Sequence, residues 1–391
     1  MSEHKAFTCL MSIDGDFLPN SHSLDSSVET VKRTLRSMFA LNSEFDIPVG
    51  NGLLCVLSSN AENTVNTSLT VTIRLHRNQN FVSINIDSCE PLIPADCNTL
   101  EANDLRGLEA ISLSNNTMDK LRRQLSDALG IEVEKIPVLK RGLAVPNYFS
   151  SSDERVLEYD FEKILFNKRS SFQHIRILHS KTLGNALLLD DLQNLADSDI
   201  AYTHSLMKYG EICYEGKEVL ILGGGDGALL HELLKEKPKF VLMVDIDEMV
   251  IESCREHLRA SCGQVLDTLK SDNYEIIIGD CVKYLEEFAA ENRKFDVIFN
   301  DLTDIPISTT ADASKHLWDF VKKILNLSLR CLRDDGKYLN HATGAGSIKA
   351  LETFEKLLTE LPVKVKFSRH SAYVPSFLEN WVFYEISKCN E

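Results

Sequence analysis

Four acidic residues of this sequence each follow a hydrophobic run that ends in a turn. They are Asp226 in EVLILGGGDGALLHEL, Asp245 after FVLMV, Asp280 after EIIIG and Asp301 after FDVIFN. Beside the first of them, Gly223 and Gly225 let a ligand approach the backbone closely, and the following helix offers its N-terminal N–H groups. Carboxylates grouped around a glycine turn indicate a binding site for a ligand that carries hydroxyl groups and positive charge.

The spacing of these residues is that of a nucleoside site. Asp245 follows Gly225 by 20 positions, where an acid accepts hydrogen bonds from ribose hydroxyls. Asp280 is suited to accept one from the exocyclic amine of adenine. The stretch GGGDGA also fits the loose dinucleotide pattern G-x-G-x-x-G/A, but a pyrophosphate would place negative charge against Asp226. A sulfonium nucleoside is positive there, so the sequence favours an S-adenosyl compound over NAD.

Asp301 indicates which group the nucleoside donates to. It lies in NDLTD, residues 300–304. An alkyl amine titrates near pH 10 and arrives protonated, whereas a carboxylate can hold this ammonium, take its proton and align it for attack. Capping of the following turn is the alternative role for Asp301. His179, His204 and His341 are expected to be structural, because a lone histidine is more often a hydrogen-bonded structural residue than a proton shuttle.

Asp226 then selects between two donors. S-adenosylmethionine would bring its own carboxylate against Asp226, whereas the decarboxylated compound presents only an ammonium, which Asp226 would bind by a charge-assisted contact. The transferred group is therefore predicted to be aminopropyl rather than methyl. A methyltransferase is the alternative that Asp226 opposes.

These acids require a fold in which the ends of several strands meet. Hydrophobic runs predict strands, each followed by a helical stretch, at residues 218–222, 240–244, 274–278 and 295–299. This alternation predicts right-handed crossovers and a mostly parallel sheet with helices on both faces, whose ligands bind beyond the carboxyl ends of the strands. Two later strands, 363–368 and 381–387, are predicted to pair antiparallel.

Three domains are predicted along the chain. Residues 1–140 mix strand-like and helical stretches, which indicates an α+β domain with an antiparallel sheet. A passage marked by Pro and Gly at residues 135–155 is typical of a linker. Residues 141–195 predict a small antiparallel β-sheet that acts as a lid, and residues 196–391 an α/β catalytic domain, Rossmann-like and of the class I methyltransferase type.

Composition excludes several classes of partner. The formal net charge of −16 and the pI of about 5.2 disfavour nucleic acid. Ten cysteines include no C-x-x-C pair, so no metal site is expected and the thiols are predicted to be free. Neither a signal or transit peptide nor a membrane-spanning apolar run is recognisable, which predicts a cytoplasmic protein with no membrane partner.

Six segments carry a resemblance to a known family. They are FQHIRILHSK, NLADSDIAYT, EVLILGGGDG, EIIIGDC, NDLTDIPIS and VPSFLENWVFY. With them, the chain resembles the spermidine/spermine synthase family of aminopropyltransferases over roughly residues 140–387, and within it the animal spermine synthases most closely. The first domain is only weakly similar to the N-terminal module of that group, which implies a fold like S-adenosylmethionine decarboxylase that is used for dimerisation.

The resemblance implies roles on the donor side of the site. The acid at Asp226 would hold the aminopropyl amine of the donor, and Asp245 would bind its ribose. Asp280 and Cys281 match a pair that contacts adenine, and Gln173 matches a glutamine on the donor side. Asp245 replaces the glutamate that is usual in spermine synthases, a shortening that ribose binding should tolerate.

Further roles are implied on the acceptor side. The acid at Asp301 would be the proton acceptor, Tyr202 would line the polyamine channel, and Glu379 would hold the far end of spermidine. The stretches YTH and PSFLEN stand where spermidine synthases typically show YQE and P-S-G-x-x-G, and both differences point to the spermine type. Phe377 replaces a tyrosine that is usual there, so a hydroxyl contact to the acceptor is lost.

The sequence therefore predicts a homodimeric enzyme that transfers an aminopropyl group from decarboxylated S-adenosylmethionine to spermidine. The products would be spermine and 5'-methylthioadenosine, and the donor would be a co-substrate, with no cofactor or metal. One alternative is a spermidine synthase that uses putrescine, which Glu379 opposes. Another is a homologue that binds a polyamine or nucleoside without turnover, which the intact set of acids opposes.

Overall fold

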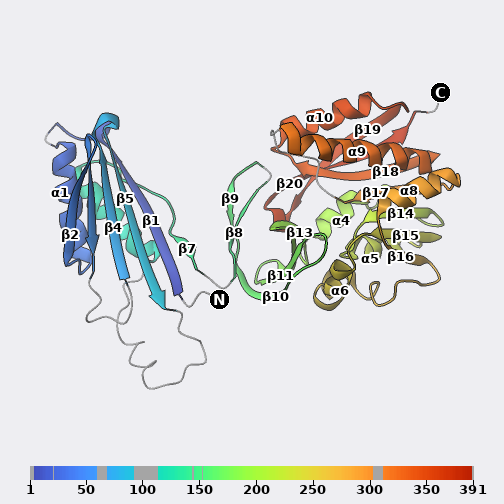
Figure 1. The fold of residues 1–391 in the computed structure, drawn as a ribbon, viewed down its shortest axis with the longest axis horizontal. Coiled ribbons are helices and arrows are strands. Elements are labelled where there is room, and N and C mark those ends of the chain that lie inside the picture. Colours follow the sequence, from blue (N-terminus) through green and yellow to red (C-terminus); the bar gives the residue numbers. More distant parts are fainter. Residues whose placement is uncertain are drawn as a thin grey trace, which may run out of the picture. The chain divides into compact units, whose positions relative to one another are not determined.

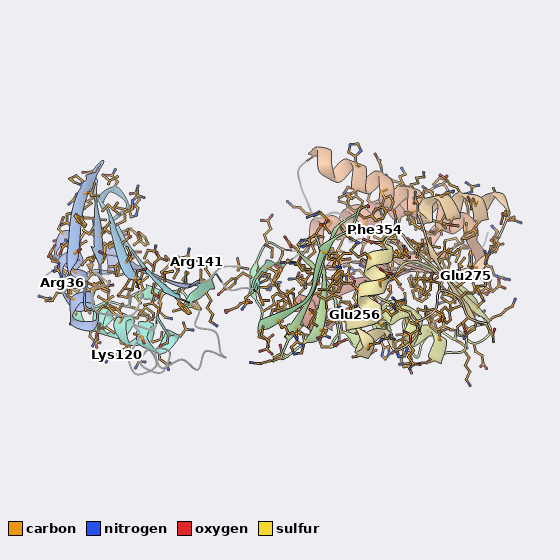
Figure 2. All side chains as sticks on the ribbon, turned by 60° about the horizontal axis from the view of Figure 1, so that its bottom comes forward. Arg36, Lys120, Arg141, Glu256, Glu275 and Phe354 are labelled. Atoms are coloured by element: carbon orange, nitrogen blue, oxygen red, sulfur yellow. The ribbon has the colours of Figure 1, made fainter. Side chains whose placement is uncertain are left out.

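The computed structural model describes residues 4–20, 22–59, 68–91, 113–142, 145–151, 153–302 and 311–389 of the chain. It divides into two compact units, Met1–Ala144 and Val145–Glu391, each described here by itself (Figure 1). Figure 2 shows that side chains fill the space between helices and sheet within each unit. No helix within these ranges is both long enough and apolar enough to span a membrane.

The first unit is an antiparallel sheet packed against two helices. Its strands are β1 (His4–Asp14), β2 (Ser43–Val49), β3 (Gly52–Ser58), β4 (Ser68–His76), β5 (Phe81–Pro91), β6 (Glu134–Lys135) and β7 (Leu139–Arg141). They run in the order β2-β3-β4-β5-β1-β6, and β7 also pairs with β1. Alternate strand residues, among them Ile13, Ile73 and Ile84, are buried with the apolar faces of α1 (Leu24–Met38) and α3 (Asn115–Leu129). The predicted antiparallel sheet is confirmed.

The stretch 135–155 is not the continuous linker that its Pro and Gly residues predict. Its beginning contributes to β6 and β7, which pair with β1. Its end forms β8 (Tyr148–Ser150), which pairs with β9 (Val156–Glu158). A strand edge offers unpaired N–H and C=O groups to a passing segment, and this pairing gives parts of the stretch strand structure.

A buried charge joins α1 to the edge strand β2. The Lys32 side chain is nearly inaccessible, and its Nζ lies 2.8 Å from both Glu44 Oε1 and Asp46 Oδ2, with Glu29 Oε1 at 3.2 Å. A buried ammonium is tolerated only where carboxylates surround it. Lys32 therefore fixes β2 against the helix.

Replacing Lys32 with Met is expected to lower the free energy of unfolding by about 2 kcal/mol, because the carboxylates lose a buried partner. Their partial exposure lets water compensate, which keeps the loss below that of a fully buried pair. Urea unfolding of the full chain measures the change. Lys120→Met, on the exposed side of α3, is the control, with an expected change below about 0.5 kcal/mol. Equal losses in the two variants would contradict the role of Lys32.

In the second unit, a small antiparallel sheet precedes the α/β region. Its strands β10 (Phe161–Arg169), β11 (His174–Ser180), β12 (Gly184–Leu189) and β13 (Leu192–Ala196) pair in chain order. The hairpin between β12 and β13 turns at Asp190 and Asp191, whose φ angles are +47° and +70°. Aspartate tolerates this left-handed conformation better than most residues.

The α/β region is built on a seven-stranded sheet. Its strands are β14 (Glu218–Gly223), β15 (Phe240–Asp245), β16 (Tyr274–Ile278), β17 (Phe295–Asp301), β18 (Leu332–Gly344), β19 (Val365–Val374) and β20 (Glu379–Lys388). They run in the order β16-β15-β14-β17-β18-β20-β19, and only the pairs that involve β20 are antiparallel. The four predicted parallel strands and the predicted antiparallel pair are confirmed.

Helices cover both faces of this sheet. One face carries α4 (Ile200–Leu206), α5 (Ala228–Lys235), α6 (Glu248–His257) and α7 (Arg259–Cys262), and the other α8 (Cys281–Ala290), α9 (Ala311–Cys331) and α10 (Ile348–Thr359) (Figure 1). Val219 and Ile221 of β14 are buried on the first face, and Leu220 and Leu222 on the second. Burial on both sides explains the continuous hydrophobic runs of these strands. This is the Rossmann-like fold of the class I methyltransferase type.

The topology of the sheet determines where a ligand can bind. From β14 the chain proceeds to β15 and β16 on one side, and then returns to β17 on the other side. The carboxyl ends of β14 and β17 therefore lie next to each other while the helices that follow them diverge. A crevice at such a reversal of strand order is where open α/β sheets bind ligands.

Candidate active site

The glycines after β14 allow two carboxylate-bearing strands to approach the loop. Gly223 has a φ of +83°, and a Cβ there would lie 2.1 Å from the carbonyl oxygen of Asp301. A Cβ on Gly225 would lie 2.7 Å from Asp245 Oδ2. Neither neighbour can move without displacing an acid, so both positions require glycine.

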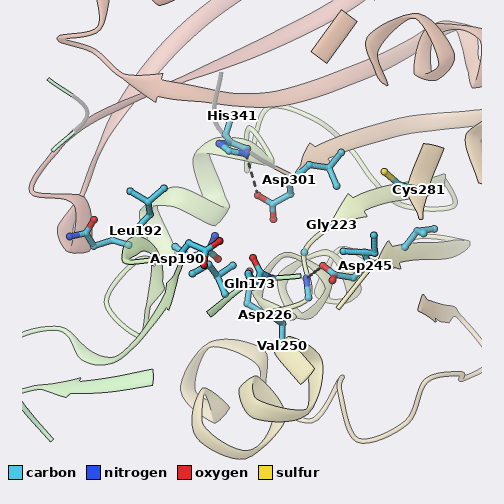
Figure 3. Close-up of a pocket in the computed structure, with 18 of the residues that line it drawn as sticks. Gln173, Asp190, Leu192, Gly223, Asp226, Asp245, Val250, Cys281, Asp301 and His341 are labelled. Carbon is cyan, nitrogen blue, oxygen red and sulfur yellow. Dashed lines mark hydrogen bonds and ion pairs between the residues drawn. The ribbon is translucent and has the colours of Figure 1, made fainter. Parts of the chain in front are cut away.

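A cavity of about 410 Å³ lies at these strand ends (Figure 3). The predicted residues that line it are Gln173, Tyr202, Gly223, Gly225, Asp226, Asp245, Asp280, Cys281, Asp301 and Phe377. The four acids thus converge on one cavity. Among the residues that the structure describes, no Lys or Arg lines this cavity, and no group of three His, Cys, Asp or Glu side chains could hold a metal ion.

Asp245 and Gln173 are held by backbone and side-chain hydrogen bonds. The Asp245 carboxylate accepts from the N–H of Gly225 and from the N–H of Asp247, both at 2.9 Å. Burial nevertheless raises the pKa of Asp245. Gln173 Nε2 donates to Asp247 Oδ2 at 3.0 Å, and Ser170 Oγ donates to the same oxygen at 2.6 Å. Asp247 therefore ties the small antiparallel sheet to the start of α6.

Asp226 and Asp301 face the cavity, and among the described residues that line it there is no Lys or Arg (Figure 3). Burial raises the pKa of Asp226, and the negative charge of Asp301 raises it further. Burial also raises the pKa of Asp301, while the hydrogen bond that Tyr202 Oη donates to Asp301 Oδ1 at 2.7 Å opposes this rise. A cationic ligand would lower both pKa values by favouring the carboxylates.

Asp280 and Cys281 lie at the end of β16 and the beginning of α8. Asp280 Oδ1 accepts from the N–H of Val282 at 2.9 Å and so caps the helix. Burial raises the pKa of the Cys281 thiol to about 12. The thiol is therefore protonated at neutral pH and is not a nucleophile.

A hydrogen-bonded turn presents Phe377 to the cavity. The ring of Phe377 lies 5.9 Å from that of Tyr202, edge to face. Its neighbour Ser376 donates its N–H and its Oγ–H to Asp199, at 2.9 and 2.5 Å, and its carbonyl accepts from Tyr159 Oη at 2.7 Å. Asp199 and Tyr159 thus fix the position of this turn.

Glu379 does not line the cavity. It begins β20, its side chain is buried, and its Oε2 lies 3.8 Å from Arg155 Nη2. It lies two positions after the cavity residue Phe377 in the chain. Asp304, the second acid of NDLTD, lies outside the described residues.

The cavity also has lining residues that were not predicted from the sequence. From the hairpin come Asp190, Leu192, Gln193 and Asn194, and from β18 comes His341. The hairpin residues show no charge pattern or spacing that would mark them. His341 has a weaker signal, because it lies within the strand-like stretch KYLNHA, near the carboxyl end of β18.

Comparisons with known proteins give the same result as the geometry. Residues 199–391 match the family described as the spermine/spermidine synthase domain, and residues 147–196 match the spermidine synthase tetramerisation domain. A polyamine aminopropyltransferase of Hyperthermus butylicus is 34% identical over 226 residues, which cover 56% of this chain and 73% of that protein. The thermospermine synthase of Arabidopsis thaliana is 27% identical over 233 residues, which cover 59% and 66%.

A crystal structure of a spermidine synthase in complex with a transition-state analogue superimposes with a TM-score of 0.49 at 22% identity, covering 62% of this chain and 79% of that one. The two matched segments contain all the described residues that line the cavity. The chain belongs to the spermidine/spermine synthase family and is a polyamine aminopropyltransferase.

Proposed function

We propose that this aminopropyltransferase moves an aminopropyl group from decarboxylated S-adenosylmethionine to spermidine. The products are then spermine and 5'-methylthioadenosine. The observation that carries the proposal is the pair of carboxylates, the buried Asp226 and the largely buried Asp301, on a cavity that no described Lys or Arg lines. Both substrates are cations, and each would supply the positive charge that favours the ionised carboxylates.

In this proposal, the donor occupies the side of the cavity nearest β15 and β16. Asp245 accepts from the ribose hydroxyls, and Asp280 and Cys281 contact the adenine. Gln173 lies on the donor side. Asp226 binds the primary ammonium of the aminopropyl group, a charge-assisted contact that a donor with its own carboxylate would lose.

The acceptor ammonium then meets Asp301. The carboxylate takes one proton, and the freed lone pair attacks the carbon next to the sulfonium. One N–C bond forms, one C–S bond breaks, and the electron pair stays on sulfur, so that 5'-methylthioadenosine leaves uncharged. Alignment and exclusion of water by the small antiparallel sheet supply the remaining acceleration.

Glu379 favours spermidine over putrescine as the acceptor. Spermidine carries one more ammonium than putrescine, and a buried carboxylate two residues beyond Phe377 offers a partner for it. The turn that Asp199 and Tyr159 hold would bring Glu379 to that end of the channel. Thermospermine is the second candidate product, since a thermospermine synthase is among the relatives.

Replacing Glu379 with Gln is expected to raise the KM for spermidine about tenfold, because one charge-assisted contact is lost. The KM for the donor should stay unchanged, which initial-rate kinetics in both substrates measures. Glu385→Gln is the control: this carboxylate also lies on β20 but pairs with Lys208 and Lys337. If the KM for spermidine is unchanged in Glu379→Gln, Glu379 does not contact the acceptor and has only a structural role.

A product assay tests the proposal as a whole. The protein is incubated with decarboxylated S-adenosylmethionine and either putrescine or spermidine, and the products are separated so that spermine and thermospermine are resolved. Spermine from spermidine alone supports the proposal. Formation of spermidine from putrescine would show that the proposed acceptor is wrong, and formation of thermospermine would show that the proposed product is wrong. In both cases the protein would still be an aminopropyltransferase.

We further propose that the first unit forms a homodimer with a second copy of this chain. Phe45, Ile47 and Val49 lie on one side of β2 and are 62%, 48% and 42% exposed, and alternate residues of a strand share a face. Apolar groups on an edge strand are typical of an interface. The match of residues 147–196 to a tetramerisation domain indicates a second surface that could assemble subunits.

Replacing both Phe45 and Ile47 with Lys is therefore expected to convert a dimer into a monomer, because the charges oppose burial of the strand face. Sedimentation equilibrium of the full chain and of this variant gives the two masses. A wild-type tetramer, or a variant that stays dimeric, would indicate instead that subunits associate through residues 147–196.

A further inference from the structure

The register of two neighbouring strands places a histidine beside Asp301. Asn300 of β17 pairs with Asn340 of β18, and Asn300 Nδ2 donates to Asn340 Oδ1 at 2.5 Å. Side chains alternate between the faces of a strand. The next residue on each strand, Asp301 and His341, therefore turns to the opposite side, where both line the cavity (Figure 3).

His341 is enclosed among groups of the proposed site. Its side chain is 6% exposed, its Nε2 lies 4.0 Å from Asp301 Oδ1, and its ring centroid lies 5.8 Å from that of Tyr202. On its other neighbour, β20, it is paired with Phe383, which carries no charge. The titratable groups that line the same cavity are Asp301 on β17, Tyr202 on α4, Asp226 after β14, Asp245 on β15, Asp280 and Cys281 at the start of α8, and Asp190 in the hairpin between β12 and β13.

The proposed reaction leaves Asp301 protonated, and Asp301 must lose this proton before the next turnover. The acceptor nitrogen enters with three protons and leaves the alkylation with two, so each turnover transfers one proton to the carboxylate. Asp301 must release it before the next acceptor can be deprotonated. Only 10% of the Asp301 side chain is exposed, so water reaches it from few directions, and a neighbouring base shortens the route.

We propose that His341 is a positioning residue that accepts this proton from Asp301 and passes it to solvent, an inference that rests on the proposed function. The imidazole Nε2 takes the proton as Asp301 returns to the carboxylate, and the imidazolium then loses it to water. A separation of 4.0 Å is longer than a hydrogen bond, so a rotation of the ring or one bridging water completes the path. Burial raises the pKa of Asp301 from its ordinary value, which brings it closer to the range in which a free imidazole titrates.

His341→Gln tests the inference, since glutamine keeps a polar side chain but cannot carry the proton. The expected result is a kcat about tenfold lower, with an unchanged KM for both substrates and a larger solvent deuterium effect on kcat, because proton release becomes slower. Calorimetric binding of 5'-methylthioadenosine shows whether the variant retains its donor site. His370→Gln is the matched control: this histidine also contacts Phe383, with ring centroids 5.6 Å apart, but lies outside the cavity and bonds the carbonyl of Ser205.

Two outcomes would overturn the inference. If kcat and the solvent deuterium effect are both unchanged, His341 only packs against its neighbours. If the KM for spermidine rises while the deuterium effect is unchanged, His341 contacts the acceptor instead. Failure of the proposed function is distinguishable from both. In that case the wild-type enzyme would form no spermine from spermidine, or Asp301→Asn would still turn over.

Discussion

Replacing Asp301 with Asn is expected to lower kcat about a thousandfold, the range that loss of a positioned general base produces. The amide has nearly the same shape and its oxygen can still accept the hydrogen bond from Tyr202, so the cavity should keep its geometry. It cannot take a proton from the acceptor ammonium. Steady-state formation of 5'-methylthioadenosine measures the loss of turnover.

Binding of the donor side should survive this change. Calorimetric titration with 5'-methylthioadenosine is expected to give an affinity within about threefold of wild type, because adenine and ribose contact other residues. Asp296→Asn is the matched control on the same strand, since Asp296 lies at the far end of β17 and accepts from the N–H of Glu218. Turnover of Asp301→Asn within tenfold of wild type would refute the assigned base.

Replacing Asp226 with Asn is expected to make the protein without substrates more stable at pH 8 and the enzyme less active. Burial and the charge of Asp301 raise the pKa of Asp226 in the folded protein. A carboxyl with a raised folded pKa contributes stability below its unfolded pKa, near 3.9, and loses it as the pH rises through the folded value. At pH 8 the ionised Asp226 carboxylate therefore lowers the free energy of unfolding by on the order of 2 kcal/mol. The uncharged Asn side chain removes this loss.

Thermal unfolding at pH 5 and pH 8 measures this effect. The variant should unfold at a higher temperature than wild type at pH 8, and the difference should shrink at pH 5, where Asp226 is protonated in the folded wild type. The same variant should lose about a hundredfold in kcat/KM for the donor, since the charge-assisted contact to its ammonium is gone. A variant that is less stable than wild type at pH 8 would contradict the cause assigned to the raised pKa.

Much of the site could be predicted because each of its acids comes directly after a hydrophobic run that can be recognised in the sequence as a strand. Asp226, Asp245, Asp280 and Asp301 all follow a hydrophobic run, and parallel strands bring such positions to one edge. The order of the strands in the sheet, in contrast, depends on contacts between segments that are far apart in the sequence. The sequence alone did not indicate that Tyr202, on a helix 99 positions before Asp301, donates to it.

Other parts depended on tertiary contacts that no spacing reveals. Glu379 was predicted as an acceptor contact, and this stays a prediction, because the residue is not among those that line the cavity and its carboxylate lies near Arg155. The strands within 135–155 arise from the edges they pair with, and the burial of Lys32 depends on carboxylates of a different element. His341 lies in a stretch that is recognisable as a strand, but only the register of β17 and β18 placed it beside Asp301.

Under the proposed function, the hydrogen bonds that hold Ser376 bear on which nitrogen of spermidine is alkylated. The two ends of spermidine differ by one methylene in their distance from the central amine, so about 1.3 Å of depth in the channel separates spermine from thermospermine. All three polar groups of Ser376 are bound by Asp199 and Tyr159, neither of which lines the cavity. We expect the regiochemistry of this enzyme to be governed by residues that the polyamine never touches.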